Sequence, residues 1–181
     1  MSRQPAFGIA LSVLVLAGAL IARPILGHTS TQQATNNQPL SIPSNQVATS
    51  TSFQTTALEK SVFEDINRYR VSRKLPKLRL NTNITKQARI HSRNMANGKV
   101  PFSHQGFEVR VNAIPLRYNS AAENVAFNQG YSNPASEAIN GWLNSPGHLK
   151  NIKGNYNVTG IGVAANQQGE VYLTQIFLRT K

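Results

Sequence analysis

The 181-residue chain contains no cysteine. It therefore has no disulfide framework, no thiolate nucleophile and no cysteine-based metal site, and hydrophobic packing alone must hold an exported form together. Acidic residues are also scarce, with seven Asp and Glu against nineteen Lys and Arg, so the formal net charge is +12. Such an excess attracts polyanions, among them nucleic acid, anionic lipid and acidic wall polymers.

The basic residues concentrate in a segment without acids that runs from Arg68 to Arg93. Its members are Arg68, Arg70, Arg73, Lys74, Lys77, Arg79, Lys86, Arg89 and Arg93. Tyr69 is its only aromatic residue, and no nucleic-acid-binding motif accompanies it. We therefore expect a solvated basic face that favours anionic envelope material or lipid, and no specific binding of nucleic acid.

A long apolar run, from Ala6 to Ala22, lies at the amino terminus and follows Arg3 with no acid before it. This is the pattern of a secretory signal peptide or a signal anchor, and seventeen residues lie at the lower limit for a membrane span. Residues 17–19 and 26–28 both offer small residues for cleavage, so cleavage and anchoring both remain open. We expect residues 1–27 to direct export, which makes the protein extracytoplasmic, either secreted or anchored to the membrane by this segment.

Residues 28–56 are rich in Thr, Ser, Gln and Asn, and they contain no Asp, Glu, Lys or Arg. Such a segment cannot bury enough apolar surface to offset the entropy of ordering it. The sequence therefore predicts a disordered linker here, and a single folded domain over residues 57–181.

Apolar residues at helical spacing predict four helices in this domain. They are expected over residues 57–73, 82–97, 134–144 and 146–152. Proline one residue after Asn133 and after Ser145 marks the starts of the last two, because the missing N–H of proline costs nothing in the first helical turn. His91 falls on the apolar stripe of the second helix, where a hydrogen-bonded core histidine is the expected role. Residues 107–118 read as irregular structure or one short helix.

Period-two patterns predict two strands, over residues 158–165 and 171–178, joined by a hairpin loop. Gly160 and Gly162 leave one face of the first strand bare, which permits close approach of another element. Helices come first and the clear strands last, without βαβ alternation. The predicted class is therefore α+β, with helices packed on a small antiparallel sheet.

His148 is expected at the third position of its short helix, after a capping Ser145. The positive field of the helix amino terminus disfavours the imidazolium form, so His148 should be neutral and free to act as ligand, base or hydrogen-bond partner. Ser145 three residues earlier is better explained as a helix cap than as a nucleophile.

Four motifs in order give the chain a family resemblance. They are Phe102-Ser103-His104, Ala122-Glu123-Asn124-Val125-Ala126, the stretch from Trp142 to Ile152 that contains Ser-Pro-Gly-His, and Tyr172-Leu173-Thr174-Gln175-Ile176-Phe177. Together they resemble the CAP superfamily of cysteine-rich secretory, antigen 5 and pathogenesis-related proteins (the SCP-like domain), in its disulfide-free bacterial branch. The resemblance covers residues 57–181. It implies an α-β-α sandwich with a small central antiparallel sheet and a cleft of histidine and acidic side chains.

By motif, His104 matches the first cleft histidine, Glu123 the first acid, and His148 the histidine that the bacterial branch carries. Ser145 stands where animal and plant members have an acid, and Tyr172 where they have a histidine. The resemblance therefore implies a ligand-binding set of His104, Glu123, Ser145, His148 and Tyr172.

Two functions from different classes remain open at this stage. The first is a binding module of the cell envelope whose ligand is a wall polymer, a lipid or a protein. The second is an envelope hydrolase with His104, Glu123 and His148 as catalytic candidates, in which Glu123 orients a histidine as general base. A divalent metal such as zinc, held by His104 and His148, is the one cofactor this second function suggests. A vestigial cleft in a purely structural protein is the third alternative.

Overall fold

The computed structural model describes the backbone of residues 44–181 and the side chains of residues 54–181. The predicted export segment and the first part of the predicted linker lie outside the described residues. Within the described part, no helix is both long and apolar enough to cross a membrane.

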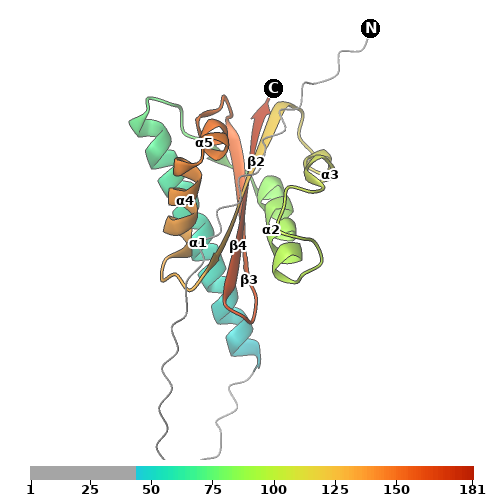
Figure 1. The fold of residues 1–181 in the computed structure, drawn as a ribbon. Coiled ribbons are helices and arrows are strands. Elements are labelled where there is room, and N and C mark those ends of the chain that lie inside the picture. Colours follow the sequence, from blue (N-terminus) through green and yellow to red (C-terminus); the bar gives the residue numbers. More distant parts are fainter. Residues whose placement is uncertain (1–43) are drawn as a thin grey trace, which may run out of the picture.

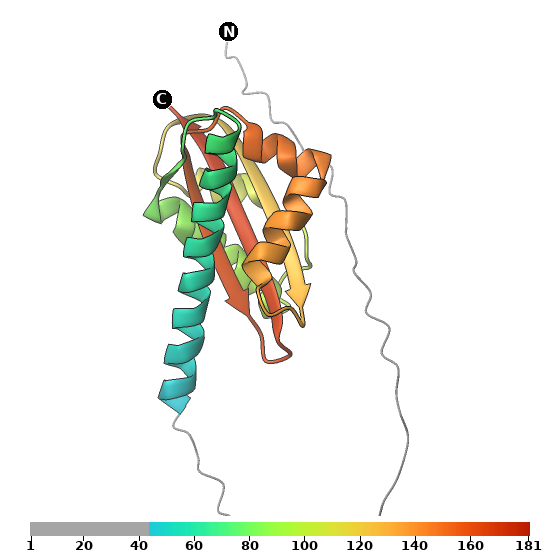
Figure 2. The same ribbon diagram turned by 90° about the vertical axis from the view of Figure 1, so that its left-hand side faces the viewer.

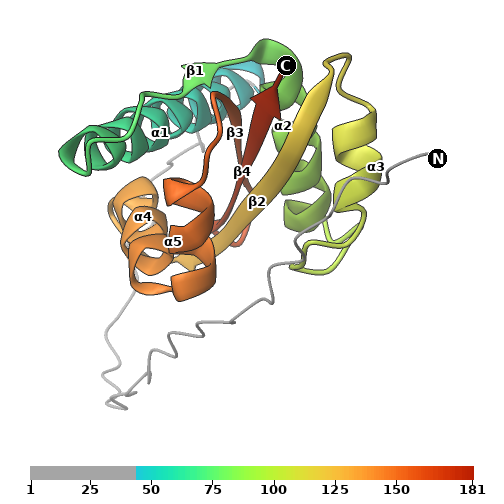
Figure 3. The same ribbon diagram turned by 90° about the horizontal axis from the view of Figure 1, so that it is seen from above.

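The described chain forms an α-β-α sandwich. Its elements are α1 (Ser44–Ser72), β1 (Arg79–Leu80), α2 (Thr82–Ala96), α3 (Phe107–Asn112), β2 (Tyr118–Gln129), α4 (Pro134–Asn144), α5 (Pro146–Lys153), β3 (Val158–Ala165) and β4 (Glu170–Thr180). Seen from above, α1, α4 and α5 lie on one side of the sheet and α2 and α3 on the other (Figure 3). The long helix α1 runs along the sheet and extends past it at its amino-terminal end (Figure 2). The predicted fold class is confirmed.

The strand order is β1-β3-β4-β2. β2 and β3 both pair with β4 in antiparallel fashion, but the two-residue β1 pairs with β3 in parallel, so the sheet is mixed and not wholly antiparallel. The sequence pattern does not predict β1 or the twelve-residue β2. In β2, residues 122–125 are buried in succession, because helices pack against both faces, so no polar–apolar alternation marks the strand.

The boundaries of the later helices agree with the sequence. α4 begins at Pro134 and α5 at Pro146, and Asn81 caps α2 by accepting the backbone N–H groups of Asn83 and Ile84. The start of α1 near residue 57 was wrong, because the helix begins at Ser44 and includes residues 44–56, which were predicted to be linker. No proline or glycine occurs between residues 44 and 72, so nothing in the chain interrupts helical hydrogen bonding once the helix has started.

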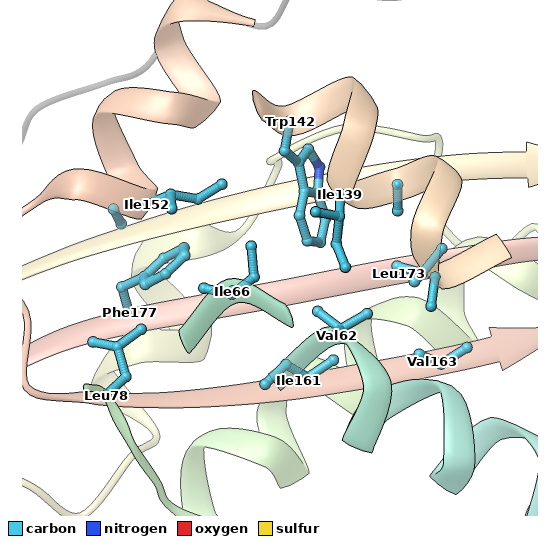
Figure 4. Close-up of a cluster of buried hydrophobic side chains, with 13 residues drawn as sticks. Val62, Ile66, Leu78, Ile139, Trp142, Ile152, Ile161, Val163, Leu173 and Phe177 are labelled. Carbon is cyan, nitrogen blue, oxygen red and sulfur yellow. The ribbon is translucent and has the colours of Figure 1, made fainter. Parts of the chain in front are cut away.

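The larger hydrophobic core lies between the sheet and the helices α1, α4 and α5. Trp142 and Ile139 of α4 face Val62 and Ile66 of α1 across it, with Phe177 of β4 beside them (Figure 4). A smaller core fills the opposite face, beneath α2 and α3. There, a Cβ atom on Gly160 or Gly162 would lie 2.2 Å or 2.1 Å from backbone nitrogens of α2, so the predicted close approach at these glycines is confirmed.

The basic segment from Arg68 to Arg93 does not form one continuous exposed face. Arg70 is 1% exposed, and its guanidinium donates to the carbonyl oxygens of Pro76, Ile152 and Gly154, which ties α1 to the end of α5. Arg68 pairs with Asp65, and Arg89 pairs with Glu59. These three cations therefore serve the fold or are balanced locally, which leaves fewer free charges than the sequence suggested.

Candidate functional site

The stretch from Trp142 to Ile152 packs on the free edge of the sheet. β2 is an edge strand, and its outward carbonyl groups need hydrogen-bond donors when helices cover them. The indole Nε1 of Trp142 donates to the carbonyl oxygen of Val125 at 2.9 Å, and the Asn151 amide donates to that of Glu123 at 3.2 Å. The α4–α5 pair is thereby fixed in register with β2.

A pair of buried asparagines then places His148. The side-chain amide of Asn151 donates to Oδ1 of Asn124 at 2.9 Å, and the amide of Asn124 donates to the carbonyl oxygen of His148 at 3.3 Å. Asn124 is fully buried. Because buried amides must find partners, these two bonds hold the first turn of α5 against the strand that carries Glu123.

Glu123 points from β2 toward the other face, where the Arg110 guanidinium meets it. Nη2 of Arg110 lies 2.8 Å and 2.9 Å from the two carboxylate oxygens, and Nε lies 3.1 Å from Oε2. Nδ1 of His104 lies 3.0 Å from Oε1. Glu123 is 4% exposed and Arg110 is 9% exposed, so this is a buried ion pair with a histidine attached.

The loop that carries His104 is built around the same guanidinium. Nη1 of Arg110 donates to the carbonyl oxygen of Gln105 at 2.7 Å. Gly106 adopts a φ of 77° at the start of α3, where a side chain would be strained. On the other side of the loop, Nε2 of His91 lies 2.9 Å from the carbonyl oxygen of Ser103, in a ring that is 1% exposed. His91 therefore has the structural role that the sequence predicted.

His148 lies on the other side of the β2 edge, with its ring centroid 6.4 Å from that of His104. Its Nδ1 lies 2.9 Å from the hydroxyl oxygen of Ser145. Burial lowers the pKa of His148, and the nearby His104 lowers it further, so the ring is neutral at pH 7. Burial is the largest cause of this lowered pKa.

The other two members of the predicted ligand-binding set, Ser145 and Tyr172, each bond to a nearby side chain. Ser145 occupies the cap position of α5, but its hydroxyl contacts His148 and makes no capping bond to a backbone N–H. Ser145 is also buried, which makes it a poor nucleophile for an external substrate. Tyr172 pairs with Phe127, four residues beyond Glu123 along β2, and its hydroxyl donates to Glu170. Tyr172 is therefore one ring of an aromatic group with Phe102 and Phe127, and its part in ligand binding stays a prediction.

The donor atoms at this site do not fit a divalent metal. Both oxygens of Glu123 are engaged by Arg110, and one also by His104, which leaves two imidazoles near a fixed positive charge. Within residues 44–181, no group of three or more His, Cys, Asp or Glu side chains is arranged to hold a metal ion. We therefore derive no step through zinc.

Sequence reasoning missed Arg110, Asn124 and Asn151. A signal for Arg110 existed, because a carboxylate among small apolar residues needs a buried partner, and Arg110 lies thirteen residues before Glu123. The two asparagines gave no such signal, since their bonds depend on how α5 meets β2.

The sequence of the chain is similar to those of known proteins. Residues 63–177 match the model of the cysteine-rich secretory protein family, CAP. The protein YkwD of Bacillus subtilis is 31% identical over 150 residues, which are 80% of this chain and 56% of YkwD. The membrane protein YlbC of the same organism is 33% identical over 131 residues, 70% of this chain and 35% of YlbC. The chain thus spans less than two thirds of either relative.

Solved structures agree on the fold. An extracellular protein of Bacillus anthracis that contains an SCP domain superposes with a TM-score of 0.61 at 24% identity, over 81% of this chain and 45% of its own. An outer surface protein of Borrelia burgdorferi superposes with a TM-score of 0.63 at 18% identity, over 70% of this chain and 96% of its own. At these identities the likeness concerns the fold alone.

Proposed function

The chain belongs to the CAP family of cysteine-rich secretory proteins, and we propose that it acts outside the cytoplasm as a ligand-binding module whose site is the cluster of His104, Glu123 and His148. The apolar run that follows Arg3 supports export or anchoring. Similarity to a protein named as a membrane protein, and to a solved protein described as extracellular, supports the same location.

The saturation of Glu123 is the observation that carries this proposal. Since Arg110 and His104 engage its oxygens, the carboxylate has little capacity left for a substrate. The ring nitrogens that face neither Glu123 nor Ser145 are the Nε2 atoms of His104 and His148. His104 is 21% exposed, so a ligand can reach it.

These two imidazoles define the chemistry of the ligand. His148 is neutral, and the charges of Arg110 and Glu123 balance each other, so hydrogen bonding rather than ion pairing dominates here. A ligand with hydroxyl or amide groups, such as a segment of wall polymer, can form hydrogen bonds with both ring nitrogens, since the centroids of the two rings are 6.4 Å apart.

One contact favours hydrolysis as a second candidate. In the neutral tautomer in which Nδ1 of His104 donates to Glu123, Nε2 carries the free lone pair and can take a proton from water. Because Ser145 is buried, water would be the nucleophile. The binding module is the stronger candidate, since Glu123, the one acid for which the described residues show a bond to the cluster, is held by Arg110 and is not free to protonate a leaving group.

The test uses soluble peptidoglycan fragments as the probe and the full-length protein. His104→Gln and His148→Gln should each weaken binding by about tenfold, the loss of one well-formed hydrogen bond. His28→Gln, outside the predicted domain, is the matched control. Mass spectrometry of the fragments after incubation separates the two functions, because new chain ends that depend on His104 indicate hydrolysis. Equal binding in all three variants would refute the cluster as the site.

A further inference from the structure

A second place on the molecule has the shape and charge of a binding site. An open hollow of about 510 Å³ lies where β1 and β3 begin and β4 ends. This end of the sheet is opposite the β3–β4 hairpin (Figure 1). The residues that line it are Arg79, Leu80, Asn81, Leu116, Arg117, Val158, Thr180 and Lys181. None of them belongs to the cluster of His104, Glu123 and His148.

The hollow is rich in basic side chains, and no Asp or Glu side chain of the described residues lines it. Arg79, Arg117 and Lys181 are exposed, and none forms an ion pair with a side chain of the described residues. All seven acidic side chains of the protein lie in the described part, and none lines the hollow. Four of the acids pair with other cations and Glu170 is bonded within the hairpin region. The positive potential of the hollow is therefore available to a ligand.

The start of α2 strengthens this potential. Asn81, which lines the hollow, is the residue that precedes the fifteen-residue helix α2. The amino terminus of a helix of this length carries partial positive charge and favours anions such as phosphate. This field adds to the positive potential of Arg79 in β1 and of Arg117 in the segment before β2.

The lining also restricts the kind of anion. Leu80 is 54% exposed, and Leu116 and Val158 add further apolar surface. None of the eight described residues that line the hollow is aromatic, so they offer no stacking surface of the kind that single-stranded nucleic acids use. We propose that the hollow binds a phosphodiester polymer with an aliphatic, polyol backbone, whose phosphates contact Arg79 and Arg117 and whose carbon chain lies over Leu80 and Leu116.

The position of the hollow suits such a polymer. Helix α1 begins at the opposite end of the molecule, as Figure 1 shows, so the chain before Ser44 joins the domain far from the hollow. The point of attachment therefore does not cover the hollow, which stays open to a polymer that approaches from solvent.

The test measures fluorescence anisotropy of a labelled hexamer of glycerol phosphate with the full-length protein in a nonionic detergent. The Arg79→Gln/Arg117→Gln double variant should weaken binding by about tenfold or more, because it removes two charge-assisted contacts. The matched control is Lys86→Gln/Arg93→Gln. It removes the same charge from exposed positions on α2 that do not line the hollow.

The outcomes distinguish this site from simple attraction by net charge. Equal losses in the two double variants would overturn the proposal in favour of long-range attraction, and no loss in either would place the polymer elsewhere. A labelled oligothymidine of equal charge, and vesicles of phosphatidylcholine with phosphatidylglycerol, serve as competitors. Tighter, Arg79-dependent binding of either one would refute the polyol-phosphate assignment. The cluster variants His104→Gln and His148→Gln should leave hexamer binding unchanged, so this proposal can fail or succeed independently of the proposed function.

Discussion

Arg110→Met removes the guanidinium group from the buried carboxylate of Glu123 while keeping a long, flexible side chain. In the native protein, three nitrogen–oxygen contacts of 2.8 to 3.1 Å join the two residues. The variant leaves Glu123, which is 4% exposed, with only the imidazole of His104 as a side-chain partner.

The expected loss of stability follows from this burial. Removal of one member of a buried ion pair costs about 3–5 kcal/mol, because the remaining charge is poorly solvated. The Arg110→Met/Glu123→Gln double variant has no unpaired buried charge at this site, and we expect it to recover at least about 1 kcal/mol relative to Arg110→Met. Arg73→Met is the control, since Arg73 is exposed and such changes usually stay within about 0.5 kcal/mol.

The chain provides its own reporter for this measurement. Trp142 is its only tryptophan and is 2% exposed, so its fluorescence should report unfolding in urea. The midpoint and slope of each curve give the free energy of unfolding. If Arg110→Met lies within 1 kcal/mol of Arg73→Met, or if the double variant is no more stable than Arg110→Met, the buried-charge explanation is wrong.

Two further predictions concern packing and pH. Gly162→Ala should lower the free energy of unfolding in urea by about 3 kcal/mol or more, because the new Cβ would lie 2.1 Å from a backbone nitrogen of α2. The control Gly141→Ala meets no atom within 4 Å and should be neutral or stabilising. Equal effects of the two changes would contradict the close approach of α2. The free energy of unfolding should fall from pH 7 to about pH 5.5, because the folded pKa values of His91 and His148 lie below 6.5 and the unfolded chain takes up protons first. His148→Gln should flatten this slope, and an unchanged slope would show that His148 does not contribute to it.

Local chemistry explains which elements the sequence predicts well. Asn133 with Pro134, and Ser145 with Pro146, define helix starts through the geometry of proline alone, and both starts are correct. The β3–β4 hairpin follows from alternation and a turn, which are equally local. β1 has two residues and exists only because β3 is there to pair with it, so no local pattern could indicate it.

At the candidate site, too, local sequence predicts some residues and not others. Its motif residues could be named from the sequence because they resemble a family pattern, but their partners depend on tertiary contacts. Asn124 and Asn151 are twenty-seven residues apart, and their hydrogen bond forms only when α5 lies on the edge of β2. The hydroxyl of Ser145 could bond to the backbone or to His148, and the choice depends on the position of the ring.

The charges of the protein are organised so that its two proposed sites use different forces. At the cluster, Arg110 neutralises Glu123 and burial keeps His148 uncharged, so a ligand there gains little from long-range attraction. At the hollow, no Asp or Glu side chain of the described residues lines the surface around Arg79 and Arg117, and the field of the two arginines extends into solvent until salt screens it. A polyanionic polymer would therefore be captured first at the hollow, in a salt-dependent step. The cluster would then select by hydrogen bonds among the uncharged groups brought near it, with little dependence on salt.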